Sequence, residues 1–170
     1  MAELQTLTSA DLKQVRTLRL TGLKESPAAF GQTAEEFERM SDEDLLAWIG
    51  PDSDKFVVGA FSENTTLVGL IGFARQTRQK VRHKGIVWGV YVSPEFRGQG
   101  ISKKLLRQLL EQVRTIPDLL QLQLTVTSSQ PAAAHLYRSF GFTEFGIEPR
   151  SLRLESGFVD EIHMYLSLGV

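Results

Sequence analysis

Residues Trp88 to Ile101 contain the pattern with the clearest chemistry in this sequence. They read Trp-Gly-Val-Tyr-Val-Ser-Pro-Glu-Phe-Arg-Gly-Gln-Gly-Ile, which predicts an apolar strand, a proline turn with two glycines, and then a helix. The start of a helix has unpaired backbone N–H groups and a partial positive charge, and glycines let the backbone approach an anion closely. Residues 97 to 103 therefore predict a phosphate or pyrophosphate cradle.

Basic residues distinguish this segment from an ordinary strand–turn–helix joint, which is the other interpretation of a short Gly-x-Gly. Arg97, Lys103 and Lys104 put positive charge where a helix usually begins with acidic residues. Two common nucleotide motifs do not fit. A Lys-Ser or Lys-Thr pair at P-loop spacing is missing, and no third glycine lies in dinucleotide-binding register. We interpret the phosphate as part of a different ligand.

Two stretches of the sequence resemble the Gcn5-related N-acetyltransferases (GNAT). Arg97-Gly98-Gln99-Gly100-Ile101-Ser102 is similar to their acetyl-CoA signature of Arg or Gln, two residues, Gly, one residue, and Gly or Ala. Residues 130 to 137, followed by Phe140-Gly141-Phe142, resemble the family pattern Asn-x-x-Ala-x-x-Leu-Tyr with a later Gly-Phe. The chain departs from these patterns at Ser102 and Gln130, which leaves their effect on coenzyme binding open.

Length, composition and charge agree with one small enzyme domain over residues 1–170. The chain is 42% hydrophobic and 23% charged with a formal net charge of −1, so no bulk charge favours nucleic acid or an anionic membrane as a partner. The absence of cysteine excludes a disulfide framework and a thiolate nucleophile. We expect no metal site from the spacing of His, Asp and Glu. Without a signal peptide or a long apolar run, the expected location is cytoplasmic.

Apolar periodicity and turn signals predict alternating helices and strands. The expected strands are a short one at Leu4 and Leu7, then 55–62, 66–76, 85–92, 120–127, 143–147 and 158–166; the expected helices begin at Thr8 or Ser9 and cover 33–49 with a break near Ser41, 101–114 and 131–140. The resemblance implies an α/β fold with a mixed, mostly antiparallel sheet of about seven strands and four helices. It also implies that strands four and five splay apart.

The resemblance implies an acetyl-CoA site across the predicted fourth strand and the Gly-rich turn. Backbone groups of the strand would bind the pantetheine arm, and N–H groups of the turn would bind the pyrophosphate. The residues expected to contact the coenzyme are Val90, Tyr91, Val92, Arg97, Gly98, Gln99, Gly100, Ile101, Ser102, Lys103 and Gln130.

Tyr137 is the expected catalytic residue. Acetyl transfer from a thioester to an amine expels a thiolate, and a phenol beside the sulfur can protonate it as a general acid. The general base stays open between Glu35, Glu36, Glu161 and water. In the ribosomal-protein N-terminal acetyltransferases of this family, a glutamate on strand five is the base, and Thr125 occupies that position here.

The sequence favours an N-acetyltransferase that moves acetyl from acetyl-CoA to a primary amine of a small molecule. A catalytically weak acyl-CoA-binding regulatory or interaction module, and a peptide or protein amine acetyltransferase, are the alternatives. A homodimer is left open. We expect the acceptor cleft between residues 26–40, the 79–84 turn and the hairpin around 150–160. The basic residues of that turn would disfavour a polycation and favour a small monoamine or an amino-acid-like compound.

Overall fold

Seven strands form one mixed sheet in the computed structural model, which describes residues 2–50 and 52–169. Their order across the sheet is β1-β2-β3-β4-β5-β7-β6, and β4 and β5 are parallel while the other neighbours are antiparallel. The strands are β1 (Glu3–Thr6), β2 (Lys55–Phe61), β3 (Leu67–Arg75), β4 (Lys84–Val92), β5 (Gln121–Thr127), β6 (Thr143–Leu154) and β7 (Gly157–Ser167). This is the α/β architecture that the resemblance implied.

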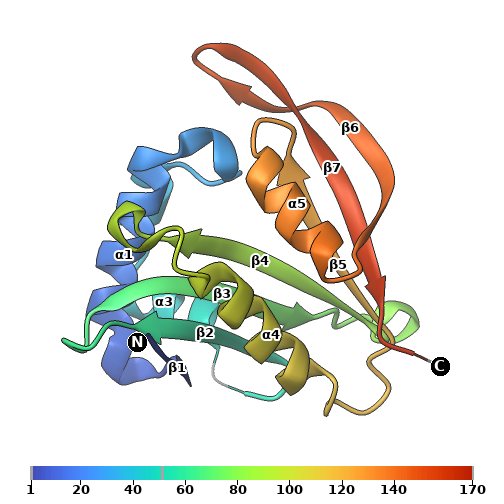
Figure 1. Cartoon of the computed structure of the whole chain (residues 1–170), viewed down its shortest axis with the longest axis horizontal. Coiled ribbons are helices and arrows are strands. Elements are labelled where there is room, and N and C mark those ends of the chain that lie inside the picture. Colours follow the sequence, from blue (N-terminus) through green and yellow to red (C-terminus); the bar gives the residue numbers. More distant parts are fainter. Residues whose placement is uncertain (1, 51, 170) are drawn as a thin grey trace.

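Helices cover both faces of the sheet (Figure 1). They are α1 (Leu12–Glu25), α2 (Ala34–Glu38), α3 (Asp42–Ile49), α4 (Ile101–Val113) and α5 (Pro131–Ser139). The predicted break near Ser41 is confirmed, because Ser41 and Asp44 form a capping box that starts α3. None of the helices in the described residues is long and apolar enough to cross a membrane.

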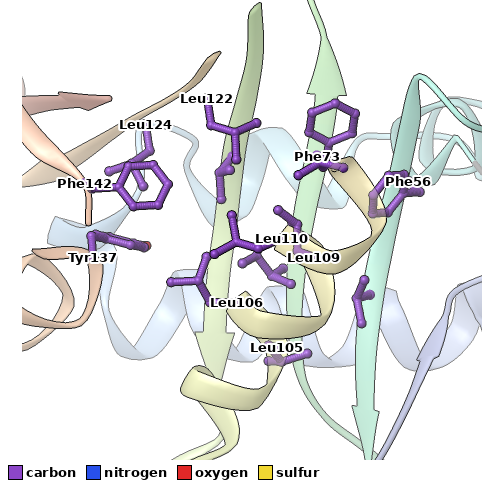
Figure 2. Close-up of a cluster of buried hydrophobic side chains, with 14 of the residues drawn as sticks. Phe56, Phe73, Leu105, Leu106, Leu109, Leu110, Leu122, Leu124, Tyr137 and Phe142 are labelled. Atoms are coloured by element: carbon purple, nitrogen blue, oxygen red, sulfur yellow. The ribbon is translucent and has the colours of Figure 1, made fainter. Parts of the chain in front are cut away.

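Strand β2 shows how the sequence builds two cores from one sheet. Phe56, Val58 and Ala60 face α4 and α5, whereas Val57 between them faces α1, α2 and α3. Alternate side chains of a strand point to opposite faces, so a strand covered on both sides reads as a continuous apolar run. Figure 2 shows the first core, where leucines of α4 lie over Phe56 of β2 and Phe73 of β3.

Strands β4 and β5 pair from Lys84 to Ile86 and then part. A β-bulge helps to turn β4 away: Leu70 pairs with Tyr91 but Gly72 pairs with Trp88, so β4 has one extra residue there. Gly89 lies in this bulge at φ 68°, a conformation that glycine adopts without strain. The predicted splay therefore begins after Ile86, and it leaves Val90 to Val92 without a strand beside them on the β5 side.

Strand β6 differs most from its predicted range, because it continues past Ile147 to Leu154. Pro149 would ordinarily interrupt the ladder, since proline has no N–H to donate. The register with β7 shifts between Glu148 and Leu152, and Arg150 adopts φ 56° within that irregular stretch. The bulge accommodates Pro149 and pairing with β7 resumes at Leu152, so the hairpin extends well beyond the other strands (Figure 1).

Candidate active site

A cleft of about 520 Å³ lies where β4, the start of α4 and α5 meet; we call it the α4 cleft. The residues predicted to bind the coenzyme that line it are Val90, Tyr91, Val92, Arg97, Gly98, Gly100, Ile101, Ser102, Lys103 and Gln130. Gln99 is the member of that prediction that does not line the cleft; its side-chain amide donates to the backbone carbonyl of Glu95 at 3.4 Å. Sequence motifs 30 residues apart thus converge on one cavity.

The N-terminus of α4 forms one wall of the α4 cleft. Gly98 and Gly100 both have φ 76°, and a Cβ atom added to either would meet nothing within 4 Å. Gly100 caps the helix without a side-chain hydrogen bond, and its first turn contains no acidic residue. Backbone N–H groups at this end of the helix therefore remain open to an anion in the cleft.

Arg97 is held in place by Glu25, the last residue of α1. Its Nη1 and Nη2 donate to Glu25 Oε1 and Oε2 at 2.9 and 2.7 Å, and its Nε donates to the carbonyl oxygen of Val92 at 3.0 Å. The Tyr91 hydroxyl also donates to Glu25, at 3.0 Å. The hydrogen bonds from Arg97 lower the pKa of Glu25, while burial raises the pKa of Tyr91 to about 12. Arg97 therefore fixes the turn, and its charge is already paired.

Tyr137 lies on the buried face of α5 and lines the α4 cleft. Its ring meets Phe142 edge to face with centroids 5.9 Å apart, and Figure 2 shows these two rings close to Leu124 of β5. No hydrogen bond links its hydroxyl to another described residue. Burial raises the pKa of Tyr137 above its ordinary value, so the phenol keeps its proton at neutral pH. That is the protonation state a general acid needs.

A second cleft of about 460 Å³, the β5 cleft, opens between the diverging strands β4 and β5. Its aromatic side chains include Phe30, Trp48 and Trp88, and the two tryptophan rings are 4.3 Å apart. Its charged and titratable residues are Arg19, Glu161 and His163. Ala29 and Phe30 line both clefts, so the two cavities are neighbours.

Glu161 is the general-base candidate from the sequence that lines the β5 cleft. Its carboxylate accepts a hydrogen bond from Ser151, and it lies on the same face of β7 as His163, whose Nε2 is 3.3 Å from Glu148. Glu36 instead forms a capping box with Thr33 at the start of α2, and neither Glu35 nor Glu36 lines either cleft. Of the three candidate carboxylates, Glu161 is therefore the one that lines a cleft.

The 79–84 turn was expected beside the acceptor, but it lines neither of the two clefts. The turn precedes the end of β4 that still pairs with β5, and none of its residues lines either cleft. Arg82 of this turn is paired with Asp54 at 2.6 Å, and its carbonyl oxygen accepts from Arg75. Its basic residues are therefore not in contact with either cleft. Of the other expected borders, the 26–40 segment contributes Ala29 to Gln32, whereas no residue of 150–160 lines either cleft. The β6–β7 hairpin contributes Phe145, Glu161 and His163 instead.

Arg19 and Glu25 were not singled out in the sequence. The sequence does contain a sign that Arg19 is buried, because it follows Leu18 within the apolar stripe of α1 that includes Val15 and Leu23. No sequence pattern indicates the role of Glu25, since its partner Arg97 is 72 positions away in the chain. Within residues 2–50 and 52–169, no group of three His, Asp or Glu side chains is arranged to hold a metal ion.

Comparisons with known proteins agree with the fold and with the motif positions. The model of the acetyltransferase (GNAT) family matches residues 21–142. A spermidine N(1)-acetyltransferase from Vibrio cholerae is 28% identical over 112 residues, which are 66% of this chain and 62% of that protein. The N-alpha-acetyltransferase RimI of Mycobacterium tuberculosis is 37% identical over 97 residues, 57% of this chain and 58% of that protein. The chain thus spans about three fifths of each of these two curated relatives.

A solved structure shows the same fold over nearly the whole chain. The phosphinothricin acetyltransferase from Sinorhizobium meliloti, in complex with AcCoA, superposes with a TM-score of 0.84 at 22% identity and covers 99% of this chain and 89% of its own. The family match includes β4, the Gly-rich turn, α4 and α5, which are the elements that build the α4 cleft. This chain therefore belongs to the acetyltransferase (GNAT) family.

Proposed function

We propose that this protein is an acetyl-CoA-dependent N-acetyltransferase that moves the acetyl group to the primary amine of a small molecule. The observation that carries the proposal is the α4 cleft, where an open helix N-terminus, the free side of β4 and the Tyr137 phenol border one cavity. A second cavity adjoins it at Phe30. Two neighbouring clefts are what a transfer between two bound molecules requires.

Backbone groups would bind most of the coenzyme. N–H groups between Gly98 and Lys103 suit a pyrophosphate, because a helix N-terminus favours negative charge and the two glycines expose the backbone. The free backbone groups of Val90 to Val92 suit the pantetheine amides, much as a sheet edge binds an added strand. The bulge at Gly89 supports this role, because it turns the strand away from β5.

Tyr137 would act as the general acid in a direct transfer. The amine nitrogen forms a bond to the acetyl carbon as the bond from that carbon to sulfur breaks, and the Tyr137 hydroxyl gives its proton to the departing thiolate. The amine also loses a proton, for which Glu161 is the carboxylate in position, directly or through water. The chain has no cysteine, which suits direct attack without a thioester on the enzyme.

A small acceptor agrees with the size and composition of the β5 cleft. Its volume of about 460 Å³ and its aromatic walls match a site for a small organic molecule. Thr125, which lines this cleft, stands where the ribosomal-protein acetyltransferases have their glutamate, and this departure supports a different acceptor.

Incubating the protein with acetyl-CoA and a panel of amines, and measuring the free thiol released, tests this proposal. The panel contains amino acids, monoamines, spermidine and short peptides with free N-termini. We expect thiol release that depends on a small amine and yields the N-acetylated product. If thiol is released with peptides alone, the acceptor is a peptide amine and not a small molecule. Coenzyme binding without release for any amine would favour a regulatory module.

A further inference from the structure

Arg19 is a buried cation that forms no ion pair with any residue the structure describes. It lies on the core side of α1 and exposes 6% of its surface. Its Nε and Nη1 atoms are sealed from solvent and have no hydrogen-bond partner among the described residues. The nearest acidic residue on its own helix, Glu25, is already bound by Arg97 and Tyr91. An unpaired buried charge is costly to a folded protein, so this arrangement needs an explanation.

Aromatic rings stabilise the Arg19 guanidinium only in part. Its Cζ atom lies 4.3 Å from the centroid of the Phe30 ring and 5.5 Å from that of Trp48. Such cation–π contacts favour the charged form but satisfy none of the N–H donors. Burial lowers the pKa of Arg19 to about 10, which leaves the group charged at neutral pH. The Arg19 side chain is therefore a fixed cation whose Nε and Nη1 donors have no acceptor among the described residues.

The guanidinium belongs to the wall of the β5 cleft. A Cβ atom added to Gly89 would lie 3.8 Å from Arg19 Nη1, so the bulge of β4 passes beside the cation without a side chain of its own. The third nitrogen, Nη2, is not among the sealed atoms. A molecule that enters between β4 and β5 can thus approach Nη2 of Arg19.

We propose that Arg19 binds an anionic group of the acceptor, a carboxylate or a group of similar shape, so that the β5 cleft selects amines that also carry an anion. This inference rests on the proposed acetyl transfer. The open Nη2 atom can donate to a carboxylate oxygen, and such an ion pair would compensate the buried charge. The same reasoning disfavours polyamines as acceptors, because they would place a second cation in the cleft that Arg19 borders.

Matched acids and amides test the inference on the wild-type protein. Phenylalanine, leucine and methionine are compared with their carboxamides as acceptors. We expect kcat/KM to favour each acid by roughly 10- to 150-fold, the range for hydrogen bonds to charged groups. The amides have the less basic and more readily deprotonated amine, so amine chemistry alone would give the opposite order.

Arg19→Met then tests whether Arg19 is the residue that favours the acid over the amide. It keeps the packing of the aliphatic stem and should remove the preference for the acid, with little change for the amides. Arg16→Met is the matched control on the same helix, since Arg16 pairs with Asp42 outside both clefts. Equal losses on acid and amide in Arg19→Met would make Arg19 a packing residue and overturn the inference.

Tryptophan fluorescence gives a readout without turnover. Trp48 and Trp88 are the two tryptophans of the chain, and both line the β5 cleft. Phenyllactate, with a hydroxyl in place of the amine, should change their emission in the wild type and not in Arg19→Met, whereas phenyllactamide should have little effect in either. If both ligands bind equally to the wild type, the anion site is wrong even if amines are acetylated. If phenyllactate binds through Arg19 but no amine releases thiol, the proposed transfer fails and the anion site remains.

Discussion

Glu25 at the end of α1 and Arg97 in the turn before α4 form a two-pronged ion pair, with Nη1–Oε1 and Nη2–Oε2 distances of 2.9 and 2.7 Å. The pair connects a helix on one face of the sheet to the turn that starts the helix on the other face. Since Arg97 also donates to the Val92 carbonyl, it fixes the end of β4 relative to the Gly-rich turn. Glu25 is thus a positioning residue for the predicted pyrophosphate cradle.

Glu25→Gln should lower stability at neutral pH and not in acid. Arg97 lowers the pKa of Glu25 in the folded protein, so this contribution is complete above the ordinary carboxyl pKa and is lost as the pH falls through the lowered value. Both side chains are substantially exposed, at 47% and 32%, which limits the effect to about 1 kcal/mol or less. Denaturant titrations at several pH values measure it. A difference from wild type that persists in strong acid would contradict this assignment.

Gly100→Val should weaken acetyl-CoA binding by roughly tenfold or more, about 1.4 kcal/mol. Its φ of 76° strains a β-branched residue, and the new side chain would occupy the space through which the backbone approaches the pyrophosphate. Gly157→Val is the control, because Gly157 also has a positive φ and open space but lies outside both clefts. Calorimetry compares the two. Equal affinity in both folded variants would place the cradle elsewhere.

Tyr137→Phe should reduce turnover about 10- to 1000-fold with nearly unchanged coenzyme affinity, because it removes the proton donor and keeps the ring against Phe142. Burial raises the pKa of Tyr137, so wild-type kcat should show no fall at moderately alkaline pH from loss of this proton. Steady-state kinetics across pH check both statements. Wild-type turnover in the variant would reduce Tyr137 to a packing role.

Glu161→Gln should lower kcat/KM by roughly a hundredfold if its carboxylate takes the amine proton. Glu36→Gln is the control: Glu36 caps α2 away from both clefts, so that variant should affect thermal stability rather than rate. Rates for both variants with one acceptor decide between them. An unchanged rate in Glu161→Gln would leave water as the proton acceptor.

The strand–turn–helix geometry of the proposed cradle could be predicted from sequence because its determinants are local. Strand, proline turn, glycines and helix start lie within Trp88 to Lys103, and short-range propensities fix each of them. The length of β6 was not predictable in the same way, because a bulge near Arg150 compensates for Pro149 only when β7 lies beside it. The Glu25–Arg97 pair depends on the tertiary fold, since the sheet has to form before these residues meet.

The borders of the β5 cleft, where we propose that the acceptor binds, were predicted less well because tertiary contacts determine them. Charge in the 79–84 turn is obvious in the sequence, yet Asp54 and the pairing of β4 with β5 keep that turn outside the clefts. Arg19 is a single charge within an apolar helical stripe. Only the folded protein shows that its guanidinium borders the β5 cleft and that Nε and Nη1 have no hydrogen-bond partner among the described residues.

The most direct test of the proposed function follows an isotopically labelled acetyl group from acetyl-CoA. With a preferred amine, the label should appear as the N-acetyl amide in an amount equal to the thiol released, and both should fall together in Gly100→Val. Thiol release without labelled amide would mean hydrolysis, and an absence of both with every amine, while acetyl-CoA still binds, would contradict acetyl transfer by this protein.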